Sequence, residues 1–212
     1  MRTSAIIVTL SFSFACLLIG ITAGADPEPV LDTSGQKVRR GVNYLIVPVS
    51  IIYPINGLTL INPSNTCPLY VVQEKSPFHG KPVTFIPLED GKDEILTSTD
   101  LNIKSSVNPI TTPCDESQSL VWSLIKGGVP GVWFVIAGGE VSEVTQTTIH
   151  VDKFGTEDYV LSFCADICPG CPITCNKLGL FEAEDGYKHL AQNYQLQPFG
   201  VRFVRAQLIS SK

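Results

Sequence analysis

The later part of this 212-residue chain lacks the features of several large protein classes. After residue 25 there is no apolar stretch long enough to span a bilayer, no low-complexity tract and no run of like charges. There is also no Gly-x-Ser-x-Gly elbow, no His-Glu-x-x-His motif and no phosphate-binding loop. The sequence therefore does not indicate an enzyme, and it predicts no cofactor.

The first 25 residues have the pattern of a removable secretion signal. Arg2 provides a short basic start, residues 5–21 are uncharged and mostly apolar, and Ala23-Gly24-Ala25 offers a small-x-small cleavage site. A transmembrane helix is the alternative, but polar Thr and Ser side chains interrupt the run and no basic stop-transfer cluster follows. We therefore expect a signal peptide at residues 1–25, one mature domain at residues 26–212, and secretion from the cell or delivery to the vacuole.

The charge balance of the mature chain is mildly acidic. Loss of Arg2 with the signal leaves 14 Lys and Arg against 20 Asp and Glu, a net charge of −6. This balance favours solubility and disfavours nucleic acid or an anionic membrane as a partner.

Four of the seven cysteines form a cluster, Cys164-x3-Cys168-x2-Cys171-x3-Cys175. Cys16 leaves with the signal, so the six that remain need no free thiol and leave none to join two copies. Because secretion leads to an oxidising compartment, we expect disulfides, no metal and a monomer. The alternatives are zinc held by four thiolates and a redox Cys-x-x-Cys. Such zinc sites belong mainly to reducing compartments, and a redox motif should open a helix in a βαβ unit, which this sequence lacks.

The mature sequence indicates an all-β domain without helices. Short runs of β-branched and aromatic residues are separated by Gly, Pro and Asn at intervals typical of such domains. We predict twelve strands, near residues 42–47, 58–61, 68–73, 83–86, 94–103, 120–125, 132–137, 148–154, 159–164, 178–183, 188–191 and 201–205. Similar strands at residues 69–72, 120–124 and 159–163 suggest three repeated units, although two stacked sheets fit the same number of strands.

Isolated aromatic and imidazole side chains have simple interpretations. His79, His150 and His189 are scattered without ligand spacing, so we expect surface or paired core residues rather than metal ligands. Trp122 and Trp133 lie in strand patterns, which favours the core over a sugar-stacking platform.

Several motifs carry a family resemblance. Residues 30–38, with the sequence VLDTSGQKV, and the following Tyr44-Leu45-Ile46 resemble the N-terminal signature of the plant Kunitz-type (soybean trypsin inhibitor) family. Further motifs follow in the family's order and spacing: Cys67-Pro68-Leu69-x-Val71-Val72-Gln73, Thr99-Asp100-Leu101-Asn102-Ile103, Val121-Trp122-x-Leu124 and Leu161-x-Phe163-Cys164. The resemblance runs from about residue 30 to about residue 186 and then thins.

Within that family, the four-cysteine cluster is similar to the miraculin-like branch. The resemblance implies a β-trefoil, a six-stranded barrel capped by three hairpins with pseudo-threefold symmetry, which also hides the strand edges. It implies three disulfides as well, Cys67–Cys114, Cys164–Cys175 and Cys168–Cys171. The first closes a long loop and is expected to remove roughly 4 kcal/mol of unfolded-state entropy.

The resemblance further implies protease inhibition through an exposed, rigid loop that fits the protease cleft. Counting from Cys67 and Asp100 places this reactive loop at residues 87–94. It consists of Pro87, Leu88, Glu89, Asp90, Gly91, Lys92, Asp93 and Glu94. The family's basic residue falls near Asp90 or Gly91, within about one position, so Lys92 is the plausible basic anchor for a trypsin-like pocket.

Two departures from the family predict a weakened loop. Four carboxylates in these eight residues oppose the insertion of Lys92 into an acidic pocket, and Gly91 loosens the backbone. In addition, Arg40 stands where active relatives often carry an Asn whose side chain braces the loop, and a guanidinium has no hydrogen-bond acceptor.

The sequence thus predicts a secreted, defence-related inhibitor of a serine (or cysteine) endopeptidase with a weakened reactive loop. The alternatives are a non-inhibitory binding or taste-modifying protein of the miraculin type, or a storage protein. A hydrolase has no supporting constellation.

Overall fold

The computed structural model describes residues 26–49, 56–62, 67–76, 80–106, 120–138, 148–165 and 174–206. The expected signal peptide, His79 and three of the cysteines (Cys114, Cys168 and Cys171) lie outside these ranges. Within them the chain forms twelve strands and no helix. They are β1 (Tyr44–Pro48), β2 (Leu58–Ile61), β3 (Leu69–Gln73), β4 (Val83–Pro87), β5 (Leu101–Ser105), β6 (Trp122–Lys126), β7 (Trp133–Ala137), β8 (Ile149–Phe154), β9 (Asp158–Ala165), β10 (Thr174–Glu182), β11 (Lys188–Gln192) and β12 (Gly200–Arg205). The described part of the chain therefore offers no helix with the length and hydropathy that a membrane crossing requires.

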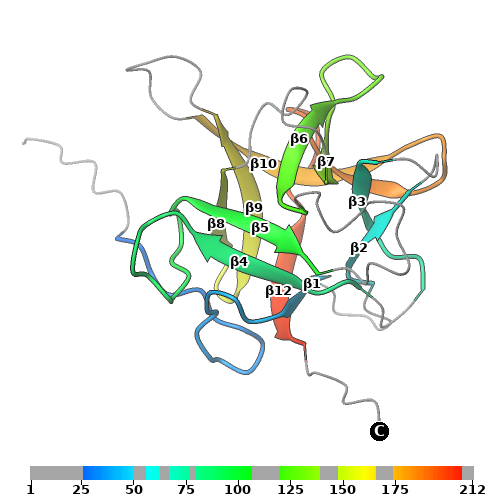
Figure 1. Cartoon of the computed structure of the whole chain (residues 1–212). Coiled ribbons are helices and arrows are strands. Elements are labelled where there is room, and N and C mark those ends of the chain that lie inside the picture. Colours follow the sequence, from blue (N-terminus) through cyan, green and yellow to red (C-terminus); the bar gives the residue numbers. More distant parts are fainter. Residues whose placement is uncertain are drawn as a thin grey trace, which may run out of the picture.

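Six of the strands close into an antiparallel barrel (Figure 1). β1 pairs with β12 and β4, β4 with β5, β5 with β8, and β8 with β9. The ring is completed where β9 pairs with β12, through Gly200 opposite Val160 and Val201 opposite Tyr159. Closure of this kind pairs each barrel strand with a neighbour on both sides and removes free edges.

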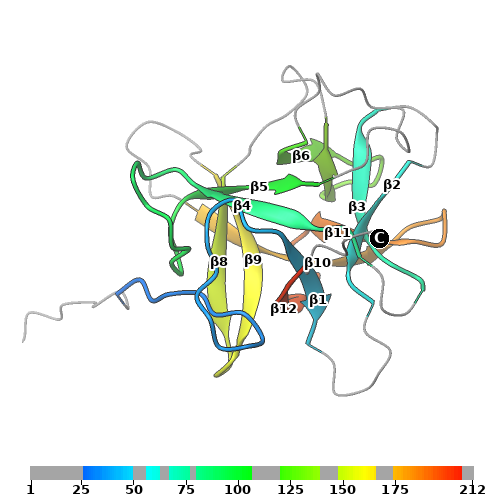
Figure 2. The same cartoon turned by 60° about the horizontal axis from the view of Figure 1, so that its bottom comes forward.

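The other strands form three hairpins, β2–β3, β6–β7 and β10–β11, that cap one end of the barrel. Figure 2 shows β2, β3 and β6 gathered to one side of the barrel strands β4, β5, β8 and β9. Inside the cap, β3 pairs with β7, β7 with β11, and β11 with β3. The third strand of each four-strand unit thus meets the other two, and the fold is the β-trefoil that the resemblance implies.

The core follows from the alternation of side chains along the barrel strands. In β4 the side chains of Val83 and Phe85 are buried, while those of Thr84 and Ile86 are partly exposed. The Phe85 ring packs edge-on against Phe203, with centroids 5.2 Å apart. The core also takes in Trp122, which is 1% exposed, and Trp133 packs against it in a half-buried position. Trp122 is therefore a core residue, as the sequence predicts, whereas Trp133 lies at the edge of the core.

All twelve predicted strands are present, but the one expected at residues 94–103 is wrong over its first seven residues. β5 begins only at Leu101. The alternation before it is real, since Ile95 and Thr97 are buried, but this extended segment pairs with the N-terminal segment instead of a barrel strand. Glu94 bridges to Arg39 and Leu96 bridges to Pro29.

The predicted strand at residues 178–183 starts too late. β10 begins at Thr174 because its first residues, Thr174–Lys177, pair with β9 in the barrel before Leu178–Glu182 pair with β11 in the cap. The side chains of residues 174–177 are all exposed, so the sequence there carries no alternating signal.

The sequence echo that suggested three units is wrong in register, although the number of units is right. Its members fall on β3, β6 and β9, which are the third, second and first strands of their units. They share composition because all three are buried strands of the fold, and they do not mark equivalent positions in the repeat.

Candidate functional site

The segment predicted to be the reactive loop, which keeps that name below, leaves the barrel between β4 and β5 and carries six consecutive exposed residues, 88–93. Its first limb begins where the buried Pro87 ends β4. There the main-chain N–H of Leu88 donates to the carbonyl oxygen of Asp100 at 3.0 Å. The Leu88 side chain is 47% exposed. The loop therefore projects into solvent while its first residue is tied to the start of β5.

Gly91 shapes the turn of this loop. Its φ is +74°, in the left-handed region that disfavours side chains, whereas a Cβ atom at this position would meet nothing within 4 Å. The restriction on residue type therefore comes from the backbone and not from crowding. The sequence interpretation treated Gly91 only as a residue that loosens the backbone. The structure adds that the conformation of the turn requires glycine here.

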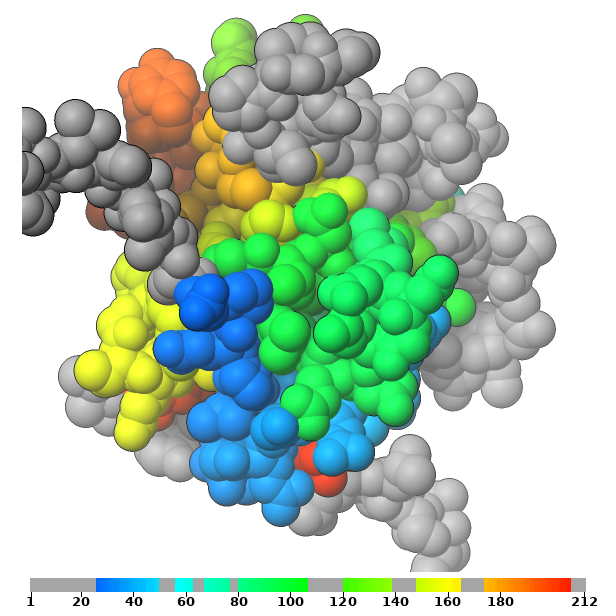
Figure 3. Space-filling view, turned by 90° about the vertical axis from the view of Figure 1, so that its left-hand side faces the viewer, coloured from blue at the N-terminus to red at the C-terminus, as the bar shows by residue number. Residues whose placement is uncertain are grey.

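The second limb of the loop lies against the N-terminal segment, residues 28–40, which we call the brace segment. In Figure 3 the blue residues of the N-terminal part lie directly against the green surface of the β4–β5 region. The N–H of Arg40 donates to the carbonyl oxygen of Asp93 at 2.7 Å, and the N–H of Ile95 donates to Val38 at 3.0 Å. The N–H of Val30 donates to Ile95 at 2.8 Å. From Asp93 onward the loop is thus held by main-chain hydrogen bonds.

Burial and one ion pair reinforce these hydrogen bonds. Val30, Val38 and Ile95 are at most 1% exposed, so the contact between the two segments has an apolar centre. At its rim, Lys37 Nζ lies 2.8 Å from one carboxylate oxygen of Glu94 and 3.0 Å from the other. Both side chains are well exposed, so this ion pair contributes little beside the buried contact.

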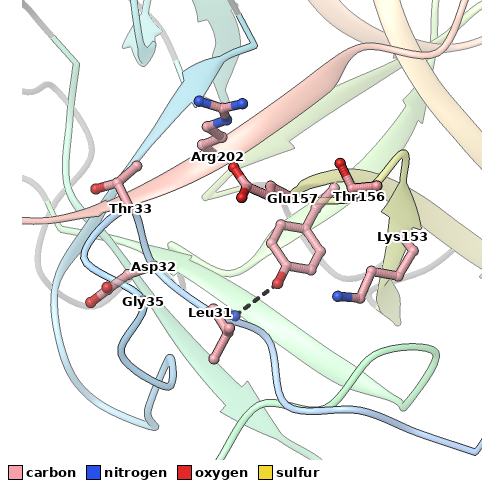
Figure 4. A pocket seen from close by; sticks show the side chains of 9 residues that line it. Leu31, Asp32, Thr33, Gly35, Lys153, Thr156, Glu157 and Arg202 are labelled. Atoms are coloured by element: carbon pink, nitrogen blue, oxygen red, sulfur yellow. Dashed lines mark hydrogen bonds between the residues drawn. The ribbon is translucent and has the colours of Figure 1, made fainter.

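The brace segment is itself fixed to the barrel. The carboxylate of Asp32, 1% exposed, accepts hydrogen bonds from the N–H groups of Ser34 and Gln36, which closes a tight turn. The N–H of Leu31 donates to the Tyr159 hydroxyl of β9 at 2.8 Å, the dashed line in Figure 4. Beside this contact lies a pocket of about 240 Å³. It is lined by Leu31, Asp32, Thr33, Gly35, Lys153, Thr156, Glu157, Tyr159 and Arg202.

Arg40 contributes to the loop differently from the Asn that the resemblance implies. Its side chain is exposed, and its main-chain N–H makes the hydrogen bond to Asp93. A main-chain donor is present for every residue type except proline. The structure therefore supplies from the main chain a contact that the sequence interpretation sought only in a side chain.

The charges of the loop are partly compensated. Lys92 Nζ lies 3.5 Å from a carboxylate oxygen of Glu89, with 48% and 67% of the two side chains exposed. Glu94 is paired with Lys37. Among the described residues no cation lies within ion-pair distance of Asp90 or Asp93. Lys92 is therefore exposed, but it carries a carboxylate partner.

A hollow of about 550 Å³ separates the loop from β8 and brings together residues that sequence reasoning kept apart. His150 on β8 is one of the residues that line it, and its Nε2 is 2.7 Å from a carboxylate oxygen of Asp100. The other ring nitrogen, Nδ1, is 3.5 Å from Sγ of Cys175. No sequence spacing indicates this contact, because the three residues come from different strands or strand ends. By contrast, His189 is a buried core residue whose Nε2 is paired with Asp185 at 2.9 Å, as expected, although its Nδ1 has no hydrogen-bond partner among the described residues.

The cysteines follow the expected chemistry wherever the structure describes them. Cys164 and Cys175 face each other across β9 and β10 and form a disulfide, the pairing that the resemblance implies. Cys67 is also disulfide-bonded. Because a disulfide sulfur carries no thiolate charge, the alternative zinc site of four thiolates is not formed in this oxidised state.

Comparison with known proteins places these features in context. The family model of Kunitz-type (legume) trypsin and protease inhibitors matches residues 30–205. Miraculin from Synsepalum dulcificum is 36% identical over 214 residues, covering 92% of this chain and 94% of miraculin. Kunitz trypsin inhibitor 5 from Arabidopsis thaliana is 34% identical over 194 residues, covering 88% of this chain and 90% of the inhibitor. Among solved structures, MP-4 from Mucuna pruriens is 30% identical with a TM-score of 0.70, covering 85% of this chain and 99% of MP-4.

Proposed function

This chain belongs to the Kunitz-type family of trypsin and protease inhibitors, and we propose that it is a secreted, defence-related inhibitor of a serine endopeptidase. The observation that carries the proposal is the exposed loop at residues 88–93, whose two limbs are tied by main-chain hydrogen bonds to Asp100 and Arg40. Such a loop loses little conformational entropy when a protease cleft closes around it.

The same hydrogen bonds explain how an inhibitor of this type resists turnover. If the protease acylates on the carbonyl carbon of Lys92, the new amino terminus is at Asp93. The Asp93 carbonyl is held by Arg40, and Ile95 is held between Val30 and Val38. The leaving amine therefore stays beside the acyl-enzyme, at a high effective concentration, and favours religation over hydrolysis.

Lys92 is the residue that we assign to the primary specificity pocket. It is the basic side chain of the loop and is 48% exposed, and the pocket of trypsin carries an Asp that prefers Arg or Lys. Insertion breaks the contact with Glu89 and brings four loop carboxylates toward an acidic site. We therefore expect trypsin inhibition in the micromolar range or weaker, on the order of −8 kcal/mol at best.

The proposal is tested with the purified mature protein, residues 26–212, titrated against trypsin, chymotrypsin, an elastase-type protease and papain. We expect inhibition of a serine protease that saturates as the inhibitor concentration rises and that yields a measurable inhibition constant. Lys92→Ala should weaken the inhibition of trypsin by about tenfold or more, because each 1.4 kcal/mol of lost contact corresponds to about a factor of ten. Lys188→Ala, an exposed lysine on β11 in the cap, is the matched control and should leave inhibition unchanged.

A second candidate is a non-inhibitory protein of the miraculin type. Two observations favour it, the 36% identity to miraculin and the carboxylates around Lys92. Absence of inhibition across the protease panel, with the loop left uncleaved, supports this candidate and overturns the inhibitor proposal.

A further inference from the structure

Three potential metal ligands converge on adjacent strands, and one of them, His150, also lines the hollow beside the reactive loop. His150 lies on β8, Cys164 on β9 and Cys175 at the start of β10. One ligand atom of each lies within 4.8 Å of the other two, and His150 Nδ1 is 3.5 Å from Sγ of Cys175. In the structure the two sulfur atoms are bonded to each other as a disulfide.

The orientation of the imidazole is already set for a ligand. Its Nε2 is 2.7 Å from Asp100 Oδ1, and an ionised carboxylate can only accept a hydrogen bond. Nε2 therefore carries a proton, and in the neutral imidazole the lone pair of Nδ1 lies on the side of Cys175 Sγ. A carboxylate that holds the second nitrogen of a metal-binding histidine is a recurrent feature of zinc sites. The His150 side chain is only 15% exposed, which limits competing orientations.

We propose that reduction of the Cys164–Cys175 disulfide creates a Zn²⁺ site made of the two cysteine thiolates and Nδ1 of His150. A dithiol reductant breaks the S–S bond by giving two electrons and two protons, and it leaves as its own disulfide. Zn²⁺ then binds both sulfurs and releases their two protons to solvent, while neutral His150 contributes its lone pair. Asp100 remains a positioning residue outside the coordination shell.

The geometry requires little rearrangement. Zinc bonds of about 2.3 Å to sulfur and 2.0–2.1 Å to nitrogen, arranged tetrahedrally, separate the ligand atoms by roughly 3.5 to 3.8 Å. The nitrogen of His150 is already at such a distance from Cys175. The two sulfurs separate when their bond is broken, because non-bonded atoms cannot stay at covalent distance. Cys164 and Cys175 remain opposite each other in the strand register, so both stay within reach of one ion. The fourth position is left for water.

This site differs from the four-thiolate site considered from the sequence. It uses a histidine 25 residues from Cys175, does not need Cys168 or Cys171, and exists only in the reduced protein. The oxidised protein has no thiolate to offer at this position. Metal binding is therefore controlled by the redox state of a single disulfide.

The test uses the mature protein with Cys168→Ser and Cys171→Ser, which removes the competing thiols of the cluster. Co²⁺ serves as the spectroscopic probe and Zn²⁺ as its competitor, before and after reduction with the phosphine TCEP, which becomes its oxide by taking oxygen from water. The matched control additionally carries Cys164→Ser and Cys175→Ser and keeps Cys67 and Cys114. We expect one Co²⁺ to bind per reduced chain, with a thiolate-to-cobalt charge-transfer band that Zn²⁺ abolishes. We expect no Co²⁺ binding and no such band in the oxidised protein or in the control.

The histidine is tested separately. His150→Asn should weaken Co²⁺ binding at least about tenfold, and Asp100→Asn should weaken it by about 10- to 100-fold, the usual effect of losing an outer partner. ¹⁵N NMR of the imidazole in the protein that keeps His150 and Asp100 provides a readout that does not depend on how the variants fold. Its Nδ1 signal should move on Zn²⁺ binding. Binding by the reduced protein no tighter than by the control, or an unchanged Nδ1 signal at saturating Zn²⁺, overturns the proposal.

Discussion

The main-chain N–H of Arg40 donates to the carbonyl oxygen of Asp93 at 2.7 Å. This hydrogen bond joins the last residue of the brace segment to the limb of the reactive loop that follows Lys92. The Arg40 side chain takes no part in it, so the contact tolerates a change of side chain at this position. The loop is therefore supported even though the chain lacks the Asn that the family resemblance implies.

Replacing Arg40 by proline tests this support, because proline removes the donor while any other residue keeps it. We expect Arg40→Pro to lower the free energy of unfolding by about 0.5–1.5 kcal/mol, the net contribution of one hydrogen bond, and to speed tryptic cleavage of the loop. Arg40→Ala is the control and should cleave at the original rate. Equal cleavage rates for the two variants would show that this hydrogen bond does not stabilise the loop.

Gly91→Ala tests the backbone of the turn. With φ at +74° and no atom within 4 Å of the added Cβ, the cost is conformational, about 1–2 kcal/mol of unfolding free energy. Gly128→Ala is the matched control, since Gly128 also has open space and its φ is not in the left-handed region. We expect that control to be neutral or slightly stabilising. Denaturant unfolding of both variants provides the measurement. Equal unfolding midpoints would contradict the conclusion that the turn requires glycine at position 91.

Glu89→Gln tests the ion pair that holds Lys92. The Lys92–Glu89 contact is exposed, so releasing it should strengthen trypsin inhibition only modestly, by up to about fivefold, as expected for a pair that contributes roughly 0–1 kcal/mol. Glu182→Gln, an exposed carboxylate on β10, controls for the change in net charge. Weaker inhibition by Glu89→Gln would mean that the carboxylate positions Lys92 for binding instead of opposing it.

We expect the stability of the cap to depend on pH through the carboxyl group of Asp185. Burial opposes ionisation, but the Tyr187 N–H, the His189 ring and the Lys75 charge together lower the pKa of Asp185 below its usual 3.8. A lowered pKa means that the carboxylate stabilises the folded state above the unfolded-state pKa, and that this contribution is lost as the pH falls through the folded-state pKa.

Asp185→Asn should therefore be less stable than the parent near neutral pH and should lose less further stability below pH 3.8. Thermal unfolding between neutral pH and strong acid measures the slope for each protein. The neighbouring Glu184→Gln, an exposed carboxylate, should keep the parental slope. If Asp185→Asn keeps that slope as well, the paired aspartate does not carry the acid sensitivity.

Much of the fold can be predicted from the sequence because it depends on local patterns. Strand periodicity places all twelve strands, since a half-buried strand must alternate apolar and polar side chains. It fails at residues 94–100, where the alternation is present but the partner is the brace segment. It also misses residues 174–177 of β10, whose exposed side chains carry no alternation although the backbone pairs with β9. In both places the pairing partner, and not the local pattern, decides the structure.

The sequence by itself determined the β class and the acidic character of residues 87–94 and, through the family resemblance, the cysteine pair Cys164–Cys175. Only the tertiary structure decided how the loop is supported and what surrounds His150. The support is made by main-chain groups, which every residue but proline carries and which therefore leave no signature in the sequence. The contact of His150 with Asp100 joins residues 50 positions apart, and it exists because barrel closure brings the start of β5 beside β8.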